Sequence, residues 1–538
     1  MGLPLRDRTL SHLLKVRSRA FANKALLKFQ DQEFSYAQAY ELSRRVAQGL
    51  MAAGIQPGQH VAIMMENRPQ ALWLHFALAL VGAVAVPVNN ASRGEMLAYY
   101  LRQSDSVALV LDQAFEERVG EVRGQCPDRK LFCIVPDDPH AGDARSRFED
   151  VPVVWWSQLV QHEPLSEDHE GPLYSDILQI LYSSGTTGPS KGSLIPNASV
   201  IRVAEKHVEV FGYDQSDVMH TCLPMFHSNA ISCTIIPALM AGATVALSRR
   251  FSASGFWREI HAHGATRTSM LSAMINFLWL RPESPEEQSH KLKTCLVVPV
   301  PAFGLEFEQR FNVRITSLYG LGDFGHVSML GPDDPREKLG SAGRVLPEVS
   351  VAILDDDDLP VADGEVGQIC LRSNEPWFGR QGYYNLPGMW LSVIRNFWVH
   401  TGDRGWVDQD GYLYFEGRSK DLIRRRGENI SAIQVEEVIR RHPAVADVSV
   451  YAVRAEFIED EVMASIVCRD GHRLDYAELI GFCAPRMAYF MVPRFVEVLE
   501  QLPLTPTGKV EKYKLRESAQ QRLAQVWDRE RHGIKLEK

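Results

Sequence analysis

The sequence lacks several signals that would place its 538 residues in a specialised class of protein. None of its eight cysteines forms a CxxC pair, so no zinc site is predicted. It has no excess of positive charge, because Lys and Arg number 58 against 67 Asp and Glu, which gives −9 at pH 7. General nucleic-acid binding needs a basic surface, and no nucleic-acid partner is therefore expected.

A secretory leader and a convincing membrane span are also missing. The first twenty residues are charged and hold no apolar stretch. Residues 71–88 carry no formal charge, but His75, Gly82 and Pro87 interrupt them. This pattern predicts a buried helix to about Leu80 and a strand over 83–88, rather than a transmembrane segment. We expect a reducing, cytoplasmic location.

The composition, with 45% apolar and 23% charged residues, is that of a globular protein. In the first half, helical periods alternate with short apolar strands, which predicts an α/β fold with parallel sheets covered by helices. From about residue 350, short alternating strands predict a smaller β-rich subdomain. We predict a large N-terminal domain over 1–417, a hinge at 418–421 and a small mobile α/β domain over 422–538.

The clearest chemical signal is the segment YSSGTTGPSKG at 182–192, which follows the strand-like run 177–181. Glycines allow backbone N–H groups to approach an anion, the hydroxyls of Ser184, Thr186 and Thr187 can donate to phosphate oxygens, and Lys191 adds a positive charge. The spacing is not that of a Walker A loop. The segment predicts a loop that holds a triphosphate; the alternative is a solvent-exposed polar turn.

Other motifs follow in a fixed order: LPMFHSNA at 223–230, YGLGD at 319–323, GEVGQICLR at 364–372, HTGD to RRRGENI at 400–430, and PLTPTGKVEK at 503–512. Together with the phosphate loop, they resemble the adenylate-forming superfamily. The resemblance covers nearly the whole chain. It is strongest to the acyl-CoA synthetase branch, and the motif sequences are most similar to those of crotonobetaine/carnitine-CoA ligase-like proteins. It implies that a carboxylate attacks Mg·ATP to form an acyl-AMP, which a thiol then displaces.

The resemblance also implies roles for individual residues. Lys509, His227 and Lys191 would be catalytic, and Lys420 would be the hinge. Residues implied in binding ATP or coenzyme A are Ser184, Gly185, Thr186, Thr187, Gly188, Tyr319, Gly320, Asp403, Arg418, Gly427 and Glu428. Taken singly, Tyr319 and His227 could each be core residues, Asp403 a turn cap, and Lys509 a solvated lysine.

Two positions depart from the pattern of the superfamily. Gly322 stands where a threonine normally binds the α-phosphate, and Asp323 stands where a glutamate normally binds magnesium. Gly322 has no side-chain donor, and loss of one donor to developing charge costs about 10²–10³ in rate when nothing replaces it. Asp323 remains the predicted metal ligand. Adenylation is therefore expected to be slow, or to be supported by other groups.

Asn229, Met274 and Val300 are the candidates for the acyl pocket by rough position, with a plain core helix as the alternative for the apolar run 269–280. The predicted function is an ATP-dependent carboxylic acid–CoA ligase using ATP, Mg²⁺ and coenzyme A. One alternative passes the acyl group to an amine or a carrier-protein thiol. Another is a homologue with impaired adenylation, limited to thioester formation or nucleotide binding. A homodimer and, for the first alternative, a carrier protein are the macromolecular partners considered.

Overall fold

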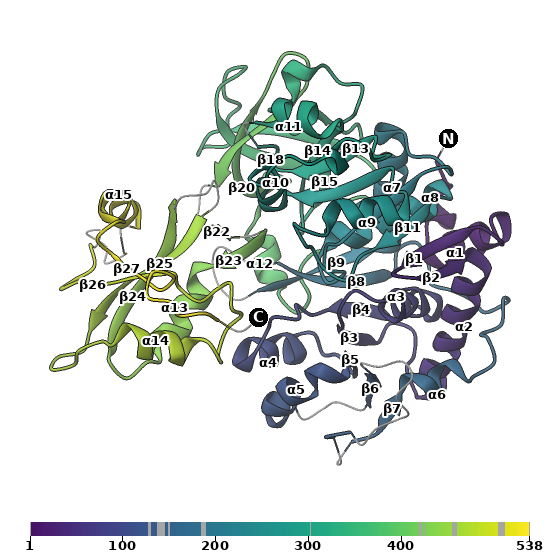
Figure 1. Cartoon of the computed structure of the whole chain (residues 1–538), viewed down its shortest axis with the longest axis horizontal. Helices are drawn as coiled ribbons and strands as arrows, with labels where there is room; N and C mark the ends of the chain where they lie inside the picture. Colours follow the sequence, from purple (N-terminus) through teal and green to yellow (C-terminus); the bar gives the residue numbers. More distant parts are fainter. Residues whose placement is uncertain are drawn as a thin grey trace.

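The structure of the chain is a computed structural model (Figure 1). It describes residues 2–126, 131–136, 146–148, 151–183, 190–301, 303–418, 422–425, 427–454, 460–503, 510 and 512–536. Two sheets and a β-rich subdomain form one body, and the C-terminal unit lies beside it (Figure 1). This is the α/β class that the sequence predicts.

The first sheet has seven strands in the order β7-β6-β5-β3-β4-β8-β9. Neighbours are parallel except β8 and β9, which form an antiparallel hairpin around residues 184–190. The strands are β3 (His60–Met64), β4 (Val84–Pro87), β5 (Ala108–Asp112), β6 (Leu131–Val135), β7 (Val153–Trp155), β8 (Ile177–Ser183) and β9 (Lys191–Pro196). The helices of this region are α2 (Tyr36–Ala52), α3 (Pro69–Val81), α4 (Gly94–Gln103), α5 (Glu116–Val122) and α6 (Trp156–Val160).

The second sheet has nine strands in the order β16-β15-β14-β13-β12-β10-β11-β1-β2. Its strands are β1 (Ala25–Phe29), β2 (Gln32–Ser35), β10 (Val218–Thr221), β11 (Thr244–Leu247), β12 (Arg267–Leu271), β13 (Thr294–Val298), β14 (Arg314–Leu321), β15 (Gly325–Leu330) and β16 (Arg344–Val345). Helices of this region are α1 (Leu10–Ala20), α7 (Asn197–Phe211), the π-helix η4 (Asn229–Ile235), α8 (Ile236–Ala241), α9 (Phe256–His263), α10 (Ser272–Trp279) and α11 (Gly304–Phe311). The sheet is parallel in its centre, but β2, β15 and β16 pair antiparallel at its two ends, so the expectation of parallel sheets holds only for the interior.

The β-rich subdomain is a five-stranded antiparallel sheet in the order β17-β18-β20-β19, with β21 paired to β20. Its elements are β17 (Val349–Leu354), β18 (Gly367–Ser373), α12 (Pro387–Leu391), β19 (Ile394–Arg395), β20 (Trp398–Val407) and β21 (Leu413–Arg418). The short strands and the smaller β-rich subdomain that the alternating pattern predicts from about residue 350 are confirmed.

The C-terminal unit has its own apolar core, which is built from residues between Ile423 and Val496. It contains the hairpin β22 (Leu422–Arg425) and β23 (Glu428–Ser431), and a four-stranded sheet β24-β25-β26-β27 (Val445–Arg454, Asp460–Cys468, Phe495–Val498, Trp527–Asp528). Its helices are α13 (Ala432–Arg440), α14 (Tyr476–Cys483) and α15 (Lys512–Arg522). The sequence analysis missed α15, because this polar helix has no clear apolar period and, among its side chains that the structure describes, buries Leu515 and Ala519 alone.

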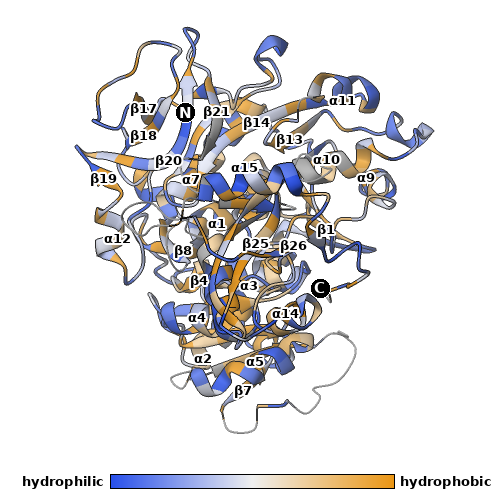
Figure 2. Ribbon diagram, turned by 90° about the vertical axis from the view of Figure 1, so that its left-hand side faces the viewer, coloured by the Kyte–Doolittle hydropathy of each residue, from blue (hydrophilic) through white to orange (hydrophobic). Residues whose placement is uncertain are grey.

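The most apolar helix, α3, is buried over nearly its whole length. It packs against α2 and β4, and Gly82 ends it in the left-handed conformation with φ of +80°. Figure 2 shows orange residues gathered in the interior around α3 and β4, while outer helices such as α4 carry blue. A helix buried on all sides needs no polar face, which explains the uncharged run. Among the described residues, no helix has the length and apolarity needed to cross a membrane.

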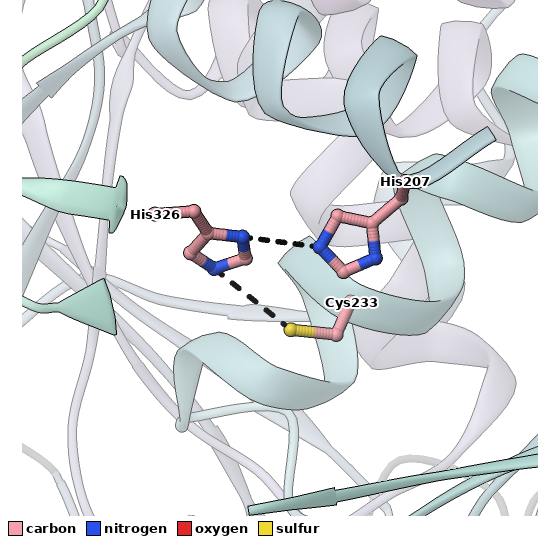
Figure 3. Close-up of side chains that lie close together, drawn as sticks. All are labelled: His207, Cys233 and His326. Atoms are coloured by element: carbon pink, nitrogen blue, oxygen red, sulfur yellow. Dashed lines mark hydrogen bonds between the residues drawn. The ribbon is translucent and has the colours of Figure 1, made fainter. Parts of the chain in front are cut away.

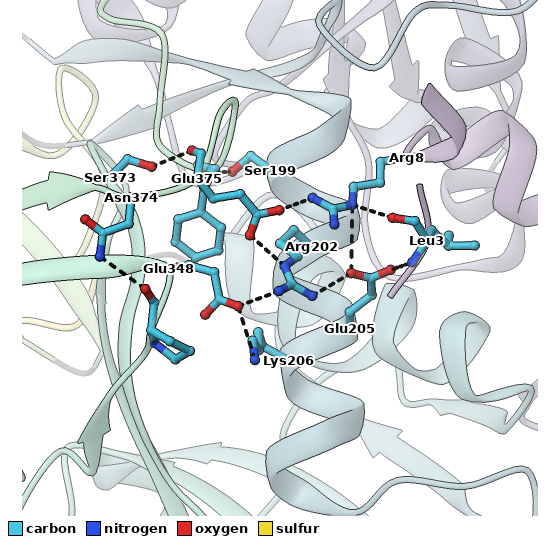
Figure 4. Close-up of polar contacts among 12 residues, drawn as sticks. Leu3, Arg8, Ser199, Arg202, Glu205, Lys206, Glu348, Ser373, Asn374 and Glu375 are labelled. Carbon is cyan, nitrogen blue, oxygen red and sulfur yellow. Dashed lines mark hydrogen bonds and ion pairs between the residues drawn. The ribbon is translucent and has the colours of Figure 1, made fainter. Parts of the chain in front are cut away.

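A cluster of charged side chains connects the β-rich subdomain to α7 (Figure 4). Arg202 of α7 donates to Glu348 at 2.6 Å, to Glu375 at 2.9 Å and to Glu205 at 3.0 Å. Glu348 and Glu375 flank β17 and β18, and Arg8 from the N-terminal segment also bonds Glu375. One guanidinium therefore joins three carboxylates from two parts of the fold, at a site where little water reaches them.

We expect Arg202→Met to lower the free energy of unfolding by about 3 kcal/mol, because it leaves three partly buried carboxylates without their shared cation. The matched control is Arg19→Met, which breaks the exposed pair with Glu167 and should change stability by less than about 1 kcal/mol. Thermal or urea unfolding of the two variants tests this. Equal stability of the two variants would contradict the assigned role of Arg202.

Candidate active site

The phosphate loop lies between β8 and β9. Ser184, Gly185, Thr186, Thr187 and Gly188 lie outside the described residues. The first residue of β9, Lys191, is buried, and its Nζ lies 5.0 Å from the centroid of the Tyr383 ring. Because β8 and β9 pair in register up to Ser183 and Lys191, both ends of the loop are held by one hairpin.

Asp323 lies in the turn between β14 and β15, next to that hairpin. Its Oδ1 accepts a hydrogen bond from the Ser193 hydroxyl at 3.0 Å, and its Oδ2 accepts one from the Tyr383 hydroxyl at 2.8 Å. One polar cluster at the end of the phosphate loop thus contains Lys191, Ser193, Tyr383 and Asp323. Carboxylate and hydroxyl oxygens are hard donors, and this set fits the magnesium ion that the sequence predicts.

Tyr319 and Asp403 come from different sheets and meet in the interior. The Tyr319 hydroxyl donates to Asp403 Oδ2 at 2.8 Å, and both residues are buried. The Tyr319 ring also stacks against Phe415, with the centroids 6.0 Å apart. Asp403 pairs along the backbone with Arg418, whose side chain lies outside the described part of the chain. The three residues implied in binding the nucleotide thus lie together, although they come from β14, β20 and β21.

Gly320 occupies a position with no room for a side chain. A Cβ there would lie 2.9 Å from the Gly325 carbonyl oxygen and 3.0 Å from Cδ2 of His326. Behind it, His326 Nδ1 bonds His207 Nε2 at 3.0 Å, and His326 Nε2 lies 4.0 Å from Cys233 Sγ (Figure 3). His326 turns a different nitrogen to each neighbour, and one nitrogen or sulfur atom from each of the three residues lies within 4.8 Å of the others.

His227 contacts the C-terminal unit. Its Nε2 lies 3.0 Å from Glu428 Oε1 of β23. The two side chains line a cavity of about 190 Å³, to which both units contribute walls. From the large domain the lining includes Tyr100, Tyr182 and Gly322, and from the C-terminal unit it includes Gly427, Gln434, Phe490 and Met491. The sequence analysis named His227, Gly427 and Glu428, but missed Tyr100, Gln434, Phe490 and Met491, which carry no motif of their own.

Two further contacts hold the C-terminal unit in this place. Gln434 of α13 donates to the Ser190 hydroxyl at 2.8 Å, directly after the phosphate loop. Gly427 has φ of +80°, and a Cβ at this position would lie 2.2 Å from Cδ1 of Leu271. The short segment around 427–434 therefore reaches the phosphate loop, β12 and His227 together, and only glycine fits at 427.

The candidates for the acyl pocket do not line this cavity. Asn229 Oδ1 accepts a hydrogen bond from the Ser269 hydroxyl at 2.7 Å, Met274 is buried in α10, and Val300 lies close to Gly304 at the start of α11. Lys420 and Lys509 lie outside the described residues. The predicted roles of these five residues stay predictions.

The pair of His227 and Glu428 makes a prediction about pH. Burial by itself lowers the pKa of His227, but the Glu428 carboxylate outweighs this and raises the pKa above its usual value of 6.5. The stabilisation from this charged contact is therefore fully present below the usual pKa of histidine and is lost as the pH rises through the raised pKa of His227. Glu428→Gln should lower the pKa of His227, because burial then acts alone. An NMR titration of labelled histidines measures this change.

The control in the same titration is His220, which is buried far from Glu428 and has a pKa lowered to about 3 by burial. It should not respond to Glu428→Gln. An unchanged pKa of His227 in that variant would mean that the two units are not in contact at this point in solution.

Comparison with known proteins supports the family resemblance that the sequence motifs indicate. Residues 14–384 match the family described as AMP-binding enzyme, and residues 434–509 match the AMP-binding enzyme C-terminal domain. The crotonobetaine/carnitine–CoA ligase of Salmonella paratyphi A is 31% identical over 510 residues, which cover 93% of this chain and 97% of that protein.

Three solved structures of two proteins share the fold over most of the chain. The o-succinylbenzoate CoA synthetase of Bacillus subtilis, bound to its product analogue, has a TM-score of 0.81 at 25% identity, over 94% of this chain and 98% of that one. The same synthetase in complex with AMP has a TM-score of 0.65. The amide bond synthetase of Marinactinospora thermotolerans has a TM-score of 0.80 at 25% identity, over 94% and 99% of the two chains. From the two matched regions and this identity, the chain belongs to the AMP-binding enzyme family.

Proposed function

We propose that this protein is an ATP-dependent carboxylic acid–CoA ligase. The acid first attacks the α-phosphate of ATP, which gives an acyl-AMP and pyrophosphate. The thiol of coenzyme A then attacks the acyl carbon, which gives an acyl-CoA and releases AMP. The observation that carries the proposal is the cavity between the two units, which brings His227 and Gly322 of the large domain together with Glu428 of the C-terminal unit.

In the first step, the protein must bring two anions together. Lys191 supplies positive charge at the end of the phosphate loop, and Asp323 with Ser193 and Tyr383 would hold Mg²⁺, which neutralises phosphate charge when it is bound. We propose that Tyr319, Asp403 and Arg418 bind the adenosine, because Asp403 offers carboxylate oxygens that suit a vicinal diol. Lys509 would contact the reacting carboxylate, as the resemblance of 503–512 implies.

In the second step, the thiol reaches the acyl-AMP through the cavity between the units. The observed arrangement suits this step, since Gly427 and Glu428 line the cavity. The higher TM-score against the product-analogue complex than against the AMP complex supports the same assignment. Rotation about 418–421 would exchange this face for the one that carries Lys509.

The partner is a small carboxylic acid, and Asn229, Met274 and Val300 remain the proposed contacts with its acyl group. The identity to a crotonobetaine/carnitine–CoA ligase makes acids of that kind the first to test. An amine acceptor enters the same test, because an amide bond synthetase shares the fold. A homodimer, a carrier-protein partner and a cytoplasmic location stay predictions.

The test is to incubate the purified protein with Mg·ATP, coenzyme A and a panel of carnitine-like, short, medium, aryl and terpenoid acids. Mass spectrometry then measures acyl-AMP and acyl-CoA separately. We expect acyl-CoA and AMP from at least one acid. Acyl-AMP without acyl-CoA would favour an amine or carrier-protein acceptor. Conversion of synthetic acyl-adenylates alone would favour the homologue with impaired adenylation.

Two substitutions should separate the half-reactions. Lys509→Ala should reduce acyl-AMP formation by about 10²-fold or more, because one charge at the reacting phosphate is lost, while synthetic acyl-adenylate is still converted to acyl-CoA. Gly427→Ala should have the opposite effect, because its Cβ would collide with Leu271 and obstruct the observed docking. Single-turnover assays of each step measure this. If both variants lost the rates of both steps equally, this would contradict the proposal that the C-terminal unit alternates between two arrangements.

A further inference from the structure

Arg380 lies directly behind the turn that departs from the family pattern. It comes from the segment between β18 and α12, and its Nε donates to the Gly322 carbonyl oxygen at 3.2 Å. Its Nη1 donates to the Ser199 hydroxyl of α7 at 2.7 Å. Gly322 also lines the cavity between the two units, so the guanidinium and the cavity meet at the same residue.

The guanidinium remains charged in this place. Burial lowers the pKa of Arg380 to about 10, against the opposing effect of Asp323, and the group is therefore protonated at neutral pH. Asp323 is the acidic group that faces it. The neighbouring His326 is neutral, because burial, with a smaller contribution from Arg380, lowers its pKa to about 3. The side chain of Arg380 is partly buried, and a cation in such a place is costly unless the site uses its charge; here it lies beside the residues that must receive phosphates.

The turn lies against this side chain. Gly325 has φ of +117°, a conformation that glycine tolerates, and a Cβ at this position would lie 3.8 Å from Cζ of Arg380. The carboxylate of Asp323 is held from the other side by Ser193 and Tyr383. Residues 322 and 323 are therefore fixed from two directions, through the carbonyl of the first and the carboxylate of the second.

We propose that Arg380 is a positioning residue for the phosphates of ATP, which compensates for the missing threonine side chain at Gly322. It holds the Gly322 carbonyl in place and adds positive charge behind the turn. In the family pattern, a threonine hydroxyl at this position binds the phosphate directly. The inference rests on the proposed function, since it assigns Arg380 to the first half-reaction. A guanidinium in a water-poor site stabilises nearby phosphate charge without reorganisation during the reaction.

The direct test is calorimetric binding of Mg·ATP and of adenosine, which needs no carboxylic acid. Arg380→Met should weaken Mg·ATP binding by about 10-fold and leave adenosine binding within about 2-fold, because the charge acts on the phosphates, which adenosine lacks. Arg380→Lys should be intermediate, since it keeps the charge but not the fork of donors. The matched control is Arg372→Met, an exposed arginine of β18 whose Nε bonds the Phe397 carbonyl oxygen. It should bind both ligands as the unchanged protein does.

A double-mutant cycle with Gly322→Thr tests the compensation itself. If Arg380 replaces the threonine, Gly322→Thr should restore Mg·ATP binding in the Arg380→Met background by about 5-fold or more, a larger gain than the same substitution gives when Arg380 is present. Thermal unfolding of each variant shows whether the fold is kept. For variants that unfold at lowered temperature, the ratio of ATP to adenosine affinity is the deciding value, because general unfolding lowers both affinities.

Two results would overturn the inference. One is an equal effect of Arg380→Met on ATP and adenosine binding, which would make Arg380 a structural residue of the turn between β14 and β15. The other is simple additivity of the two substitutions in the cycle. Failure of the proposed ligase function is a separate result, since it would appear as an absence of acyl-AMP and acyl-CoA from the acid panel in the unchanged protein, whatever the variants bind.

Discussion

The carboxylate of Asp323 accepts hydrogen bonds from groups that belong to separate parts of the fold. Asp323 itself lies between β14 and β15 of the second sheet, Ser193 lies on β9 of the first sheet, and Tyr383 follows β18 of the β-rich subdomain. An acidic group between sheets is stable only when its oxygens are satisfied, and here both are. The same contacts aim the carboxylate at the end of the phosphate loop. The contacts that pack the sheets together are thus the same contacts that position the proposed metal ligand.

The C-terminal unit completes the site but does not share the core of the large domain. Its core is built from its own apolar residues, and among the described residues of the large domain Ala91 and Met96 pack against that core. Its contacts with the site include Glu428 with His227, Gln434 with Ser190, and Gly427 against Leu271. An interface of this kind can be exchanged at little cost in buried apolar surface. The proposed alternation between two half-reactions needs such an interface, because each step requires a different face of the small unit.

Much of the fold could be predicted from the sequence, because the large domain repeats short apolar strands and amphipathic or buried helices. The helix to about Leu80, the strand at 83–88 and the strand-like run at 177–181 agree with the structure within a few residues. The helix α15 was missed because its stability comes from a small apolar contact in a polar stretch. The order of strands in the sheets and the antiparallel ends of the second sheet could not be predicted, since pairing depends on contacts far apart in the sequence.

The sequence by itself determined the family, the order of its motifs and the two unusual residues at 322 and 323, because these follow from residue type and spacing. Only the tertiary structure decided what surrounds them. It placed Arg380 behind Gly322, although 58 residues separate the two, and it brought Glu428 against His227 across 201 residues. It also showed that Asn229, Met274 and Val300 do not line the cavity that His227 and Glu428 share. The physical reason is that side-chain contacts depend on sheet order and on the docking of the small unit, which a motif does not encode.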